Sequence, residues 1–154
     1  MKYTSTVIAV SDVNTSRRFY EDLFGLELYQ DYGINVSFTC GLSLQQEFDW
    51  LVSVPRETVL KRSHNMELSF ETREFDSFLE KLEQYPGVRR LGEVIEHSWG
   101  QRVVRFYDPD GHLIEVGENM KLVVERFLSA GMTMEEVSAR MGVSIKDLTT
   151  LLNE

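Results

Sequence analysis

The sequence is poor in cysteine and proline. Of its 154 residues, one is cysteine, three are proline and three are histidine. A single cysteine excludes an intrachain disulfide and a zinc site built from cysteines. Because Cys40 lies in the strand-like segment VSFTC, we expect it to be a small buried residue rather than a nucleophile.

Basic residues are scarce relative to acidic ones. Lys and Arg total 16 against 25 Asp and Glu, which gives a formal net charge of −9. An acidic surface repels phosphate groups, so nucleic acid and anionic membranes are poor partners. The N-terminus lacks the apolar stretch of a signal peptide, and no run is long enough to span a bilayer. We therefore expect a cytoplasmic protein with no nucleic-acid or membrane partner.

What the sequence does contain is an order of strands and helices that occurs twice. Residues 3–10 predict a strand, the residues up to Gly25 predict a helix, and three short strand-like segments follow. The second half repeats this order in MELSFE, EFDSFLEKLEQY, RRLGEVIEH, QRVVRFY and HLIEVGE. We therefore predict an α+β fold with two βαβββ modules, over about 1–50 and 63–118, whose curled mixed sheets surround a cavity.

The two halves also align residue by residue. TVIAVSD aligns with MELSFET at an offset of 60, FYEDL with FLEKL at 59, and GLSLQ with GHLIE at 70. Near the end of the second half, DPDG has the residues of a type I turn, with Asp first, Pro second and Gly fourth. We interpret that motif as structural and assign it no catalytic role.

Residues 119–154 extend beyond the second module, and their pattern predicts helices. Thr133 and Glu136 have the spacing of a capping box at the start of one helix. The last two predicted helices look like a helix-turn-helix. From Thr133 onward, however, only Arg140 and Lys146 are basic, against four acidic residues, so we reject DNA binding. We expect these helices to pack on a sheet or on a second subunit.

Two segments, VSDVNTSRRFYEDLFGLEL and WGQRVVRFYDPDGHLIEV, together with the duplication, resemble the vicinal oxygen chelate superfamily. That superfamily holds glyoxalase I, bleomycin-resistance proteins, extradiol dioxygenases and fosfomycin-resistance enzymes. The resemblance covers residues 1–118. It implies that a small organic ligand binds in the cavity of the paired modules. It also implies a homodimer, since members often dimerise.

In the metal-dependent members, the ligands come from the first and last strand of each half, and glyoxalase I uses two histidines and two glutamates. The resemblance places these four positions on Ser5, Gln45, Asn65 and Glu115. A serine and two amides are weak ligands for nickel, zinc or iron, so a divalent metal is not favoured. The four polar side chains suit hydrogen bonding to an organic ligand.

Glu115 and Glu67 are the candidate catalytic residues. Two carboxylates that face one cavity repel, and the pKa of one then rises, which suits general acid or base chemistry. With one of His64 or His97, the same glutamates form an alternative metal triad. Each glutamate also has a structural interpretation as a paired carboxylate.

Two tryptophans and an arginine complete the set of candidate ligand-binding residues. Trp50 and Trp99 lie in loop-like segments after strands, where they can close a pocket. Arg102 is the candidate cation. Alternation along a strand puts Arg102 and Arg105 on opposite faces, and the sequence leaves open which of them enters the cavity.

Three functions stay open. The favoured one is a small-molecule-binding protein of the glyoxalase/bleomycin-resistance/dioxygenase type, because the four mapped positions are poor metal ligands. The second is a metal-dependent lyase or extradiol-type dioxygenase that acts on vicinal oxygens. The third is an interaction protein that uses its C-terminal helices. The sequence decides neither the ligand nor whether there is catalysis.

Overall fold

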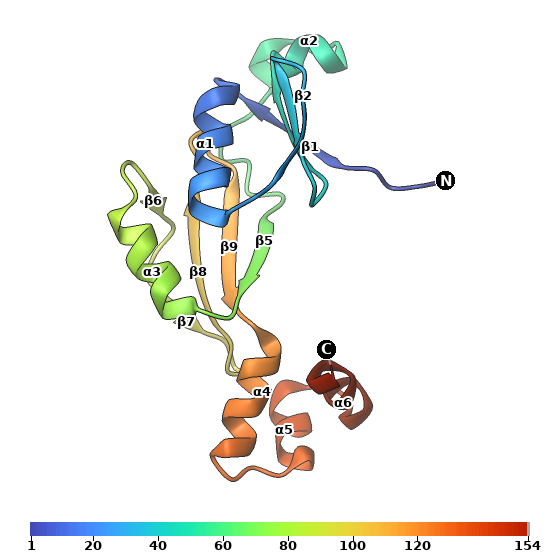
Figure 1. The fold of residues 1–154 in the computed structure, drawn as a ribbon, viewed down its shortest axis with the longest axis vertical. Helices are drawn as coiled ribbons and strands as arrows, with labels where there is room; N and C mark the ends of the chain where they lie inside the picture. Colours follow the sequence, from blue (N-terminus) through green and yellow to red (C-terminus); the bar gives the residue numbers. More distant parts are fainter. Residues whose placement is uncertain (154) are drawn as a thin grey trace. The chain divides into compact units, whose positions relative to one another are not determined.

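A computed structural model describes residues 1–153, and Figure 1 shows the fold as a ribbon. The chain begins with a strand, a helix and three strands. These are β1 (Thr6–Val10), α1 (Val13–Phe24), β2 (Leu28–Asp31), β3 (Asn35–Phe38) and β4 (Leu42–Gln46). A short helix and a 3-10 turn follow, namely α2 (Phe48–Val52) and η1 (Arg56–Thr58).

The same order then repeats and ends in three helices. The second set comprises β5 (Leu68–Thr72), α3 (Phe75–Gln84), β6 (Arg89–Arg90), β7 (Ile95–Glu96), β8 (Arg102–Tyr107) and β9 (Leu113–Glu118). The C-terminal helices are α4 (Met120–Ser129), α5 (Met134–Met141) and α6 (Ile145–Asn153). The predicted α+β class, with two modules and a helical extension, is confirmed.

Helix α1 begins and ends where its sequence predicts. The Asp12 side chain accepts a hydrogen bond from the backbone N–H of Thr15, which satisfies one free donor of the first turn. Gly25 ends the helix in the left-handed conformation, at a φ of 65°. Phe19, Tyr20 and Leu23 are buried on one side of the helix, so α1 turns an apolar stripe toward its sheet.

The first sheet has the strand order β1-β4-β3-β2, with β1 parallel to β4. Alternation along the strands divides its side chains between two faces. One face is apolar and buried, and α1 covers it; its residues are Ile8, Val10, Val36, Phe38, Leu42 and Leu44. The opposite face carries mostly polar side chains, and α2 contacts the edge strand β1. We call it the polar face of the first sheet; its residues are Ser5, Val7, Ala9, Asn35, Ser37, Ser43 and Gln45.

The second sheet has the order β5-β9-β8-β6, with β7 also paired to β8. Helix α3 covers one face, where Phe78 contacts the ring of Phe106. The predicted strand RRLGEVIEH is wrong in part. It consists of two strands of two residues each, because a turn that contains Gly92, at a φ of 91°, separates them.

Neither sheet is curled, so the prediction of curled sheets is wrong. The first sheet has β1 and β2 as its edges, and the second has β5 as an edge. A sheet closes around a cavity when about eight strands take part. The first sheet has four strands of four or five residues, which are too few and too short to do this alone.

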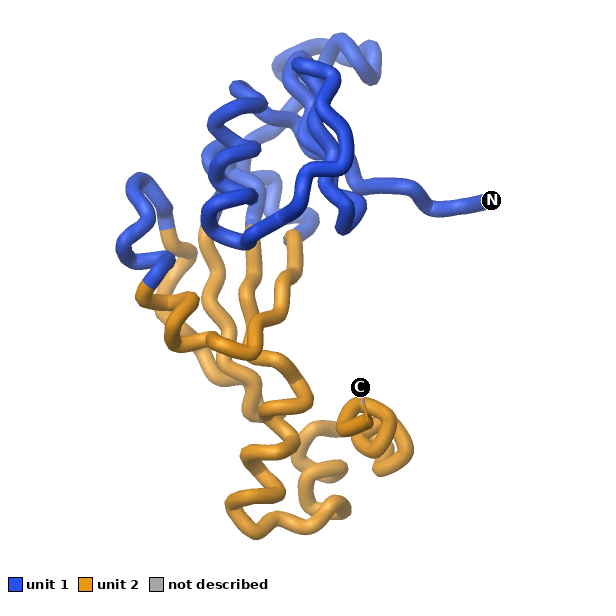
Figure 2. Tube along the Cα trace, in the orientation of Figure 1, with its two compact units in different colours: residues 1–67, 81–89, 107–113 blue, residues 68–80, 90–106, 114–154 orange. Residues whose placement is uncertain are grey.

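Contacts divide the chain into two compact units, which Figure 2 colours separately. The first holds residues 1–67, 81–89 and 107–113, and the second holds the rest of the described chain. The turn between β8 and β9 therefore belongs to the first unit. The boundaries drawn from the sequence at residues 50, 63 and 118 stay predictions.

The DPDG turn is held by two buried carboxylates. The Gly111 N–H donates to the Asp108 carbonyl at 3.1 Å, which confirms the predicted turn. Asp108 accepts a hydrogen bond from the Tyr20 hydroxyl at 2.8 Å. Asp110 accepts from the Ser16 hydroxyl at 2.9 Å and from the Ser11 N–H at 2.8 Å. These bonds fix residues 107–113 on α1 and on the end of β1.

Burial raises the pKa of both Tyr20 and Asp108, which are the donor and the acceptor of one hydrogen bond in this turn. Desolvation, followed by the charge of Asp108, raises the pKa of Tyr20 well above its ordinary value, so the phenol stays a donor. Desolvation also raises the pKa of Asp108, against the opposing effects of His112 and of its hydrogen bonds. Three donors meet the Asp108 carboxylate, namely the Tyr20 hydroxyl and the N–H groups of Asp110 and His112.

Cys40 does not occupy the position that its neighbours predict. It is exposed in the turn between β3 and β4, so the expectation of a buried residue is wrong. Strand β3 ends at Phe38, and the hairpin turn takes up the next residues.

The C-terminal helices have a small core of their own. Val123, Val124, Phe127, Val137 and Leu148 are buried together. The predicted capping box at the start of α5 is confirmed, since the side chains of Thr133 and Glu136 each accept from the other's backbone N–H. Within residues 1–153, no helix has the length and apolar character that a membrane span requires.

Glu118 joins the second sheet to α4. Its carboxylate accepts hydrogen bonds from the guanidinium groups of Arg102 and Arg126, both at 2.8 Å in the shortest pair. Arg102 also donates to Asp76 in α3 at 2.8 Å. Burial raises the pKa of Glu118, but the bonds from Arg126 and Arg102 outweigh it and lower the pKa to about 2.

The core of the C-terminal helices predicts a large effect of one substitution. Leu148→Ala removes a side chain that is 1% exposed. It should lower the free energy of unfolding by about 2–5 kcal/mol, measured by urea denaturation followed by helix circular dichroism. Ile145→Ala is the control because that residue of the same helix is 41% exposed, and it should change stability by less than about 1 kcal/mol. Equal effects of the two variants would show that this core does not exist.

The ion pairs of Glu118 predict a pH-dependent loss of stability. At pH 7, Glu118→Gln should lower the free energy of unfolding by about 1–3 kcal/mol. The folded-state pKa is lowered from 4.5 to about 2, so the stabilisation is present above pH 4.5 and is lost as the pH falls toward 2. Denaturation over this range should show the variant and wild type converging. Exposed Glu93→Gln serves as the matched control, and a gap independent of pH would refute the assignment.

Candidate functional site

The polar face of the first sheet carries two of the four positions that the resemblance singles out, Ser5 and Gln45. A groove of about 260 Å³ lies on this face. Ser5, Asn35, Ser37, Ser43 and Tyr29 are among its lining residues. Uncharged hydrogen-bonding groups therefore dominate the groove, and no carboxylate or histidine lines it.

Gln45 supports this groove rather than lining it. Its side chain is buried, its carbonyl accepts from the Asn35 amide at 2.8 Å, and its amide donates to the Gln46 carbonyl at 2.6 Å. Gln45 therefore fixes the orientation of Asn35. Within residues 1–153, no side chain is hydrogen-bonded to the hydroxyls of Ser37 and Ser43, which leaves them able to bind a ligand.

In the second sheet, Glu115 lies on the face opposite α3. Residue 115 is in register with Ser69 of β5. The Glu115 carboxylate forms an ion pair with Arg105 of β8, and the two side chains are 14% and 25% exposed. The sequence left open which of Arg102 and Arg105 lies on the same face as Glu115, and the structure shows that it is Arg105.

Arg102 points to the other side of the second sheet. Its guanidinium lies over the ring of Phe75 in α3 at 5.0 Å, between the carboxylates of Asp76 and Glu118. Alternation along β8 explains this, because residues 102 and 105 are three positions apart. The Arg102 guanidinium already forms ion pairs with Asp76 and Glu118, so a ligand must compete with these carboxylates to bind it.

Asn65 and Glu67 lie outside the strand that the repeat predicts for them. Strand β5 begins at Leu68, and both residues are exposed in the segment before it. The Asn65 carbonyl accepts a hydrogen bond from the Ser63 hydroxyl at 2.8 Å. Whether either residue contacts a ligand stays a prediction.

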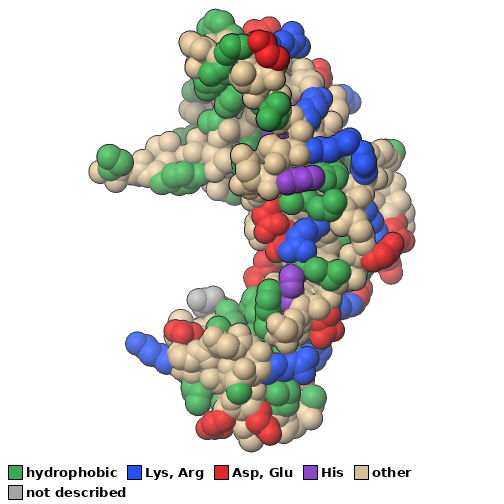
Figure 3. Space-filling view, turned by 180° about the vertical axis from the view of Figure 1, so that it is seen from behind, with side chains coloured by type: hydrophobic (Ala, Val, Ile, Leu, Met, Phe, Trp, Pro, Cys, Tyr) green, Lys and Arg blue, Asp and Glu red, His purple; other side chains and the backbone are tan. Residues whose placement is uncertain are grey.

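The remaining candidates have local partners. His64, at a positive φ of 54°, is hydrogen-bonded to the Tyr107 hydroxyl at 2.6 Å. The His97 ring stacks on Trp99 with centroids 4.0 Å apart, and the Trp99 indole donates to Gln101. Figure 3 shows histidines among interspersed acidic and basic side chains on one face of the molecule.

The residues present do not fit a metal. In the part of the chain that the structure describes, no three side chains of His, Cys, Asp or Glu are grouped so that they could hold an ion. Of the four mapped positions, only Glu115 has a carboxylate, and an arginine pairs with it. The donors that a transition metal prefers are therefore missing at these positions.

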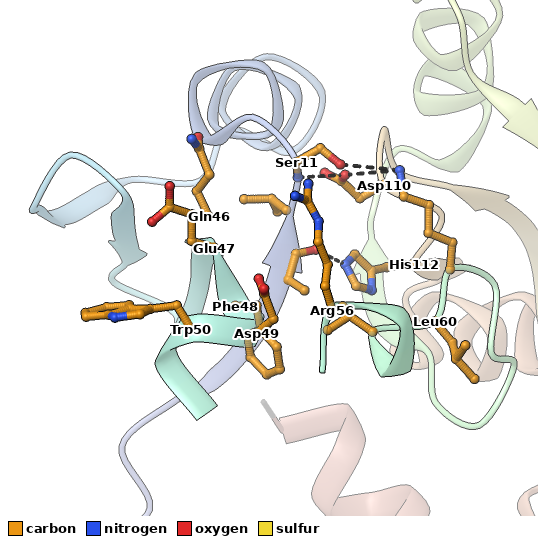
Figure 4. Close-up of a pocket in the computed structure, with 14 residues that line it drawn as sticks. Ser11, Gln46, Glu47, Phe48, Asp49, Trp50, Arg56, Leu60, Asp110 and His112 are labelled. Carbon is orange, nitrogen blue, oxygen red and sulfur yellow. Dashed lines mark hydrogen bonds and ion pairs between the residues drawn. The ribbon is translucent and has the colours of Figure 1, made fainter. Parts of the chain in front are cut away.

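A larger cavity, of about 610 Å³, lies at the ends of β1 and β4 (Figure 4). Trp50 lies at its rim, in helix α2 rather than in the predicted loop, and is 68% exposed. Arg56, Asp49 and His112 also line this cavity, and the sequence did not single them out for ligand binding. His112 lies far along the chain from the segment that holds Asp49 and Arg56, so no sequence motif joins the three residues.

Solved structures share this fold. A protein of unknown function from Agrobacterium tumefaciens str. C58 is 35% identical, with a TM-score of 0.65 over 77% of this chain and 94% of that one. A lactoylglutathione lyase from Agrobacterium tumefaciens is 23% identical, with a TM-score of 0.59 over 77% and 94%. A glyoxalase/bleomycin resistance protein/dioxygenase family enzyme from Burkholderia phytofirmans PsJN is 15% identical, with a TM-score of 0.66 over 77% and 98%.

A family model supports the same assignment on sequence. The model of the Glyoxalase-like domain matches residues 3–121, which include both sheets and the beginning of α4. Helices α5 and α6 lie beyond the match. The chain belongs to the Glyoxalase-like domain family, in the vicinal oxygen chelate superfamily, as the two segments and the duplication had indicated.

Proposed function

We propose that this protein binds a small organic molecule on the polar face of the first sheet. The observation that carries the proposal is the chemistry of this face. At two of the positions where metalloenzymes of the superfamily place ligands, this chain has Ser5 and Gln45. Ser5 lines a groove to which Ser37 and Ser43 add further hydroxyls. Such groups hydrogen-bond to organic ligands and are weak metal ligands.

The groove also defines the class of ligand. Hydroxyls donate and accept, and the Asn35 amide does both, so the groove suits a neutral compound with hydroxyl or amide groups. Its volume of about 260 Å³ fits a small molecule or one end of a larger one. Tyr29, which is 66% exposed, supplies an aromatic surface beside the polar groups.

Glu115 has a proposed role in recognition. Because Arg105 pairs with it, a ligand that contacts Glu115 on the face of the second sheet opposite α3 either binds both partners or displaces the arginine. General acid or base chemistry by Glu115 and Glu67 stays a weaker proposal. Ligand contacts by Asn65, Trp50, Trp99 and Arg102 also stay predictions, as do the homodimer and the cytoplasmic location.

The two alternatives carry less support. A metal-dependent lyase or dioxygenase needs ligands that the mapped positions lack. An interaction role for the C-terminal helices has one observation in its favour, their separate core. Removal of residues 133–154, followed by measurement of oligomeric state and solubility, distinguishes docking from packing, because packing helices cannot be removed without loss of both.

The proposed groove predicts which substitution weakens binding. In a thermal-shift screen of neutral hydroxyl and amide compounds, hits that stabilise the wild type should bind Ser43→Ala about fivefold more weakly or worse, measured by calorimetry. The loss follows from removal of one hydrogen-bonding hydroxyl without added volume. Thr39→Ala is the matched control because Thr39 is exposed outside the groove, and it should leave affinity unchanged. Hits that bind Ser43→Ala as well as wild type would place the ligand elsewhere.

The mapped positions also predict the metal content. The protein, purified without an affinity tag, should carry less than stoichiometric zinc, nickel, iron or manganese by elemental analysis. Glu115→Gln should leave zinc affinity unchanged in a calorimetric titration, since Arg105 already engages that carboxylate. A stoichiometric metal that is lost in Glu115→Gln would favour the metal-dependent enzyme instead.

A further inference from the structure

The cavity at the ends of β1 and β4 lies in the first compact unit and is separate from the proposed groove. It shares no lining residue with the groove. Its walls come from the ends of β1 and β4, from α2, from the segment 56–61 and from the DPDG turn. The buried bonds of Asp110 hold the turn, so one wall of the cavity is fixed.

Two charges of opposite sign face this cavity without a partner. In Figure 4 the Arg56 side chain extends across the cavity toward Ser11, and the Asp49 carboxylate points from α2 into the same space. Among the described residues, neither side chain is hydrogen-bonded or ion-paired. Asp49 is half-buried, although its carboxylate has no cation to compensate it.

The other charged groups of the cavity are already engaged. Lys61 lies 3.7 Å from the Asp110 carboxylate and 3.3 Å from the Ser11 hydroxyl. His112 donates from its Nε2 to the Ala9 carbonyl at 2.6 Å. A charged ligand therefore meets Arg56 and Asp49 first.

An apolar wall lies beside these charges. Phe48, Val59 and Leu60 line the cavity, and Trp50 stands at its rim. Leu60 and Trp50 are 69% and 68% exposed, so their apolar surface is accessible to a ligand. The cavity thus combines one unpaired cation, one unpaired anion and an apolar surface.

We propose that this cavity is a second ligand site, which binds a small zwitterion of the α-amino-acid type. The ligand's carboxylate binds the Arg56 guanidinium, whose planar donors match a carboxylate. Its ammonium binds the Asp49 carboxylate. Its apolar side chain covers Leu60 and Phe48. A ligand with only one charge leaves the other protein charge uncompensated, which is why a zwitterion fits best.

The test compares L-phenylalanine with two analogues that each lack one charge. L-phenylalaninamide lacks the carboxylate, and 3-phenylpropionate lacks the ammonium group. Titrations of the full-length protein followed by amide chemical shifts should place L-phenylalanine at residues 48–61 and at His112, away from Ser43. Its dissociation constant should be at least about tenfold lower than that of either analogue, because each loses one charge-assisted contact.

Two variants assign the charges separately. Arg56→Gln should abolish the preference for L-phenylalanine over L-phenylalaninamide and keep the preference over 3-phenylpropionate. Asp49→Asn should do the reverse. Arg18→Gln is the matched control, since it removes an exposed arginine of α1 that does not line the cavity. The proposal is overturned if L-phenylalanine causes no shifts up to its solubility limit, if the three compounds bind equally, or if Arg18→Gln acts like Arg56→Gln.

Discussion

The buried carboxylates of the DPDG turn are the constraint on which the first compact unit depends. Asp108 and Asp110 are nearly inaccessible, and such groups are costly to bury unless donors compensate them. Tyr20, Ser16 and the Ser11 N–H supply those donors from α1 and the end of β1. A segment almost a hundred residues later in the chain is thereby fixed beside the first strand and helix.

That constraint also shapes the surface near the ends of β1 and β4. The turn places His112 against the Ala9 carbonyl and Asp110 near Lys61. These groups therefore already have partners within the protein. The unpaired charges, Arg56 and Asp49, belong to the segment after β4, where Asp49 lies in α2 and Arg56 in η1. The proposed second site at this end of the sheet therefore takes its charges from α2 and η1 and one of its walls from the fixed turn.

The two faces of the first sheet differ in their chemistry. Leu44 and Val36 are buried under α1, and the alternate positions carry Ser43, Ser37 and Asn35. Two of the mapped metal-ligand positions, Ser5 and Gln45, also lie on this face, and a hydroxyl and an amide there are weaker ligands for a transition metal than imidazole or carboxylate. The fold is kept because it depends on the apolar face, while the chemistry of the other face is free to vary.

The sequence alone determined the local structure: the end of a helix at Gly25, the cap at Thr133, the βαβββ duplication and the family. These follow from short-range rules of periodicity and capping, which neighbours along the chain satisfy. It did not determine that Arg105, rather than Arg102, lies beside Glu115, or that Arg56 and Asp49 face one cavity. Side-chain direction in a sheet depends on where a strand begins and which helix covers it, and a cavity depends on segments far apart in sequence. Only the tertiary structure decides both, because only packing brings those segments together.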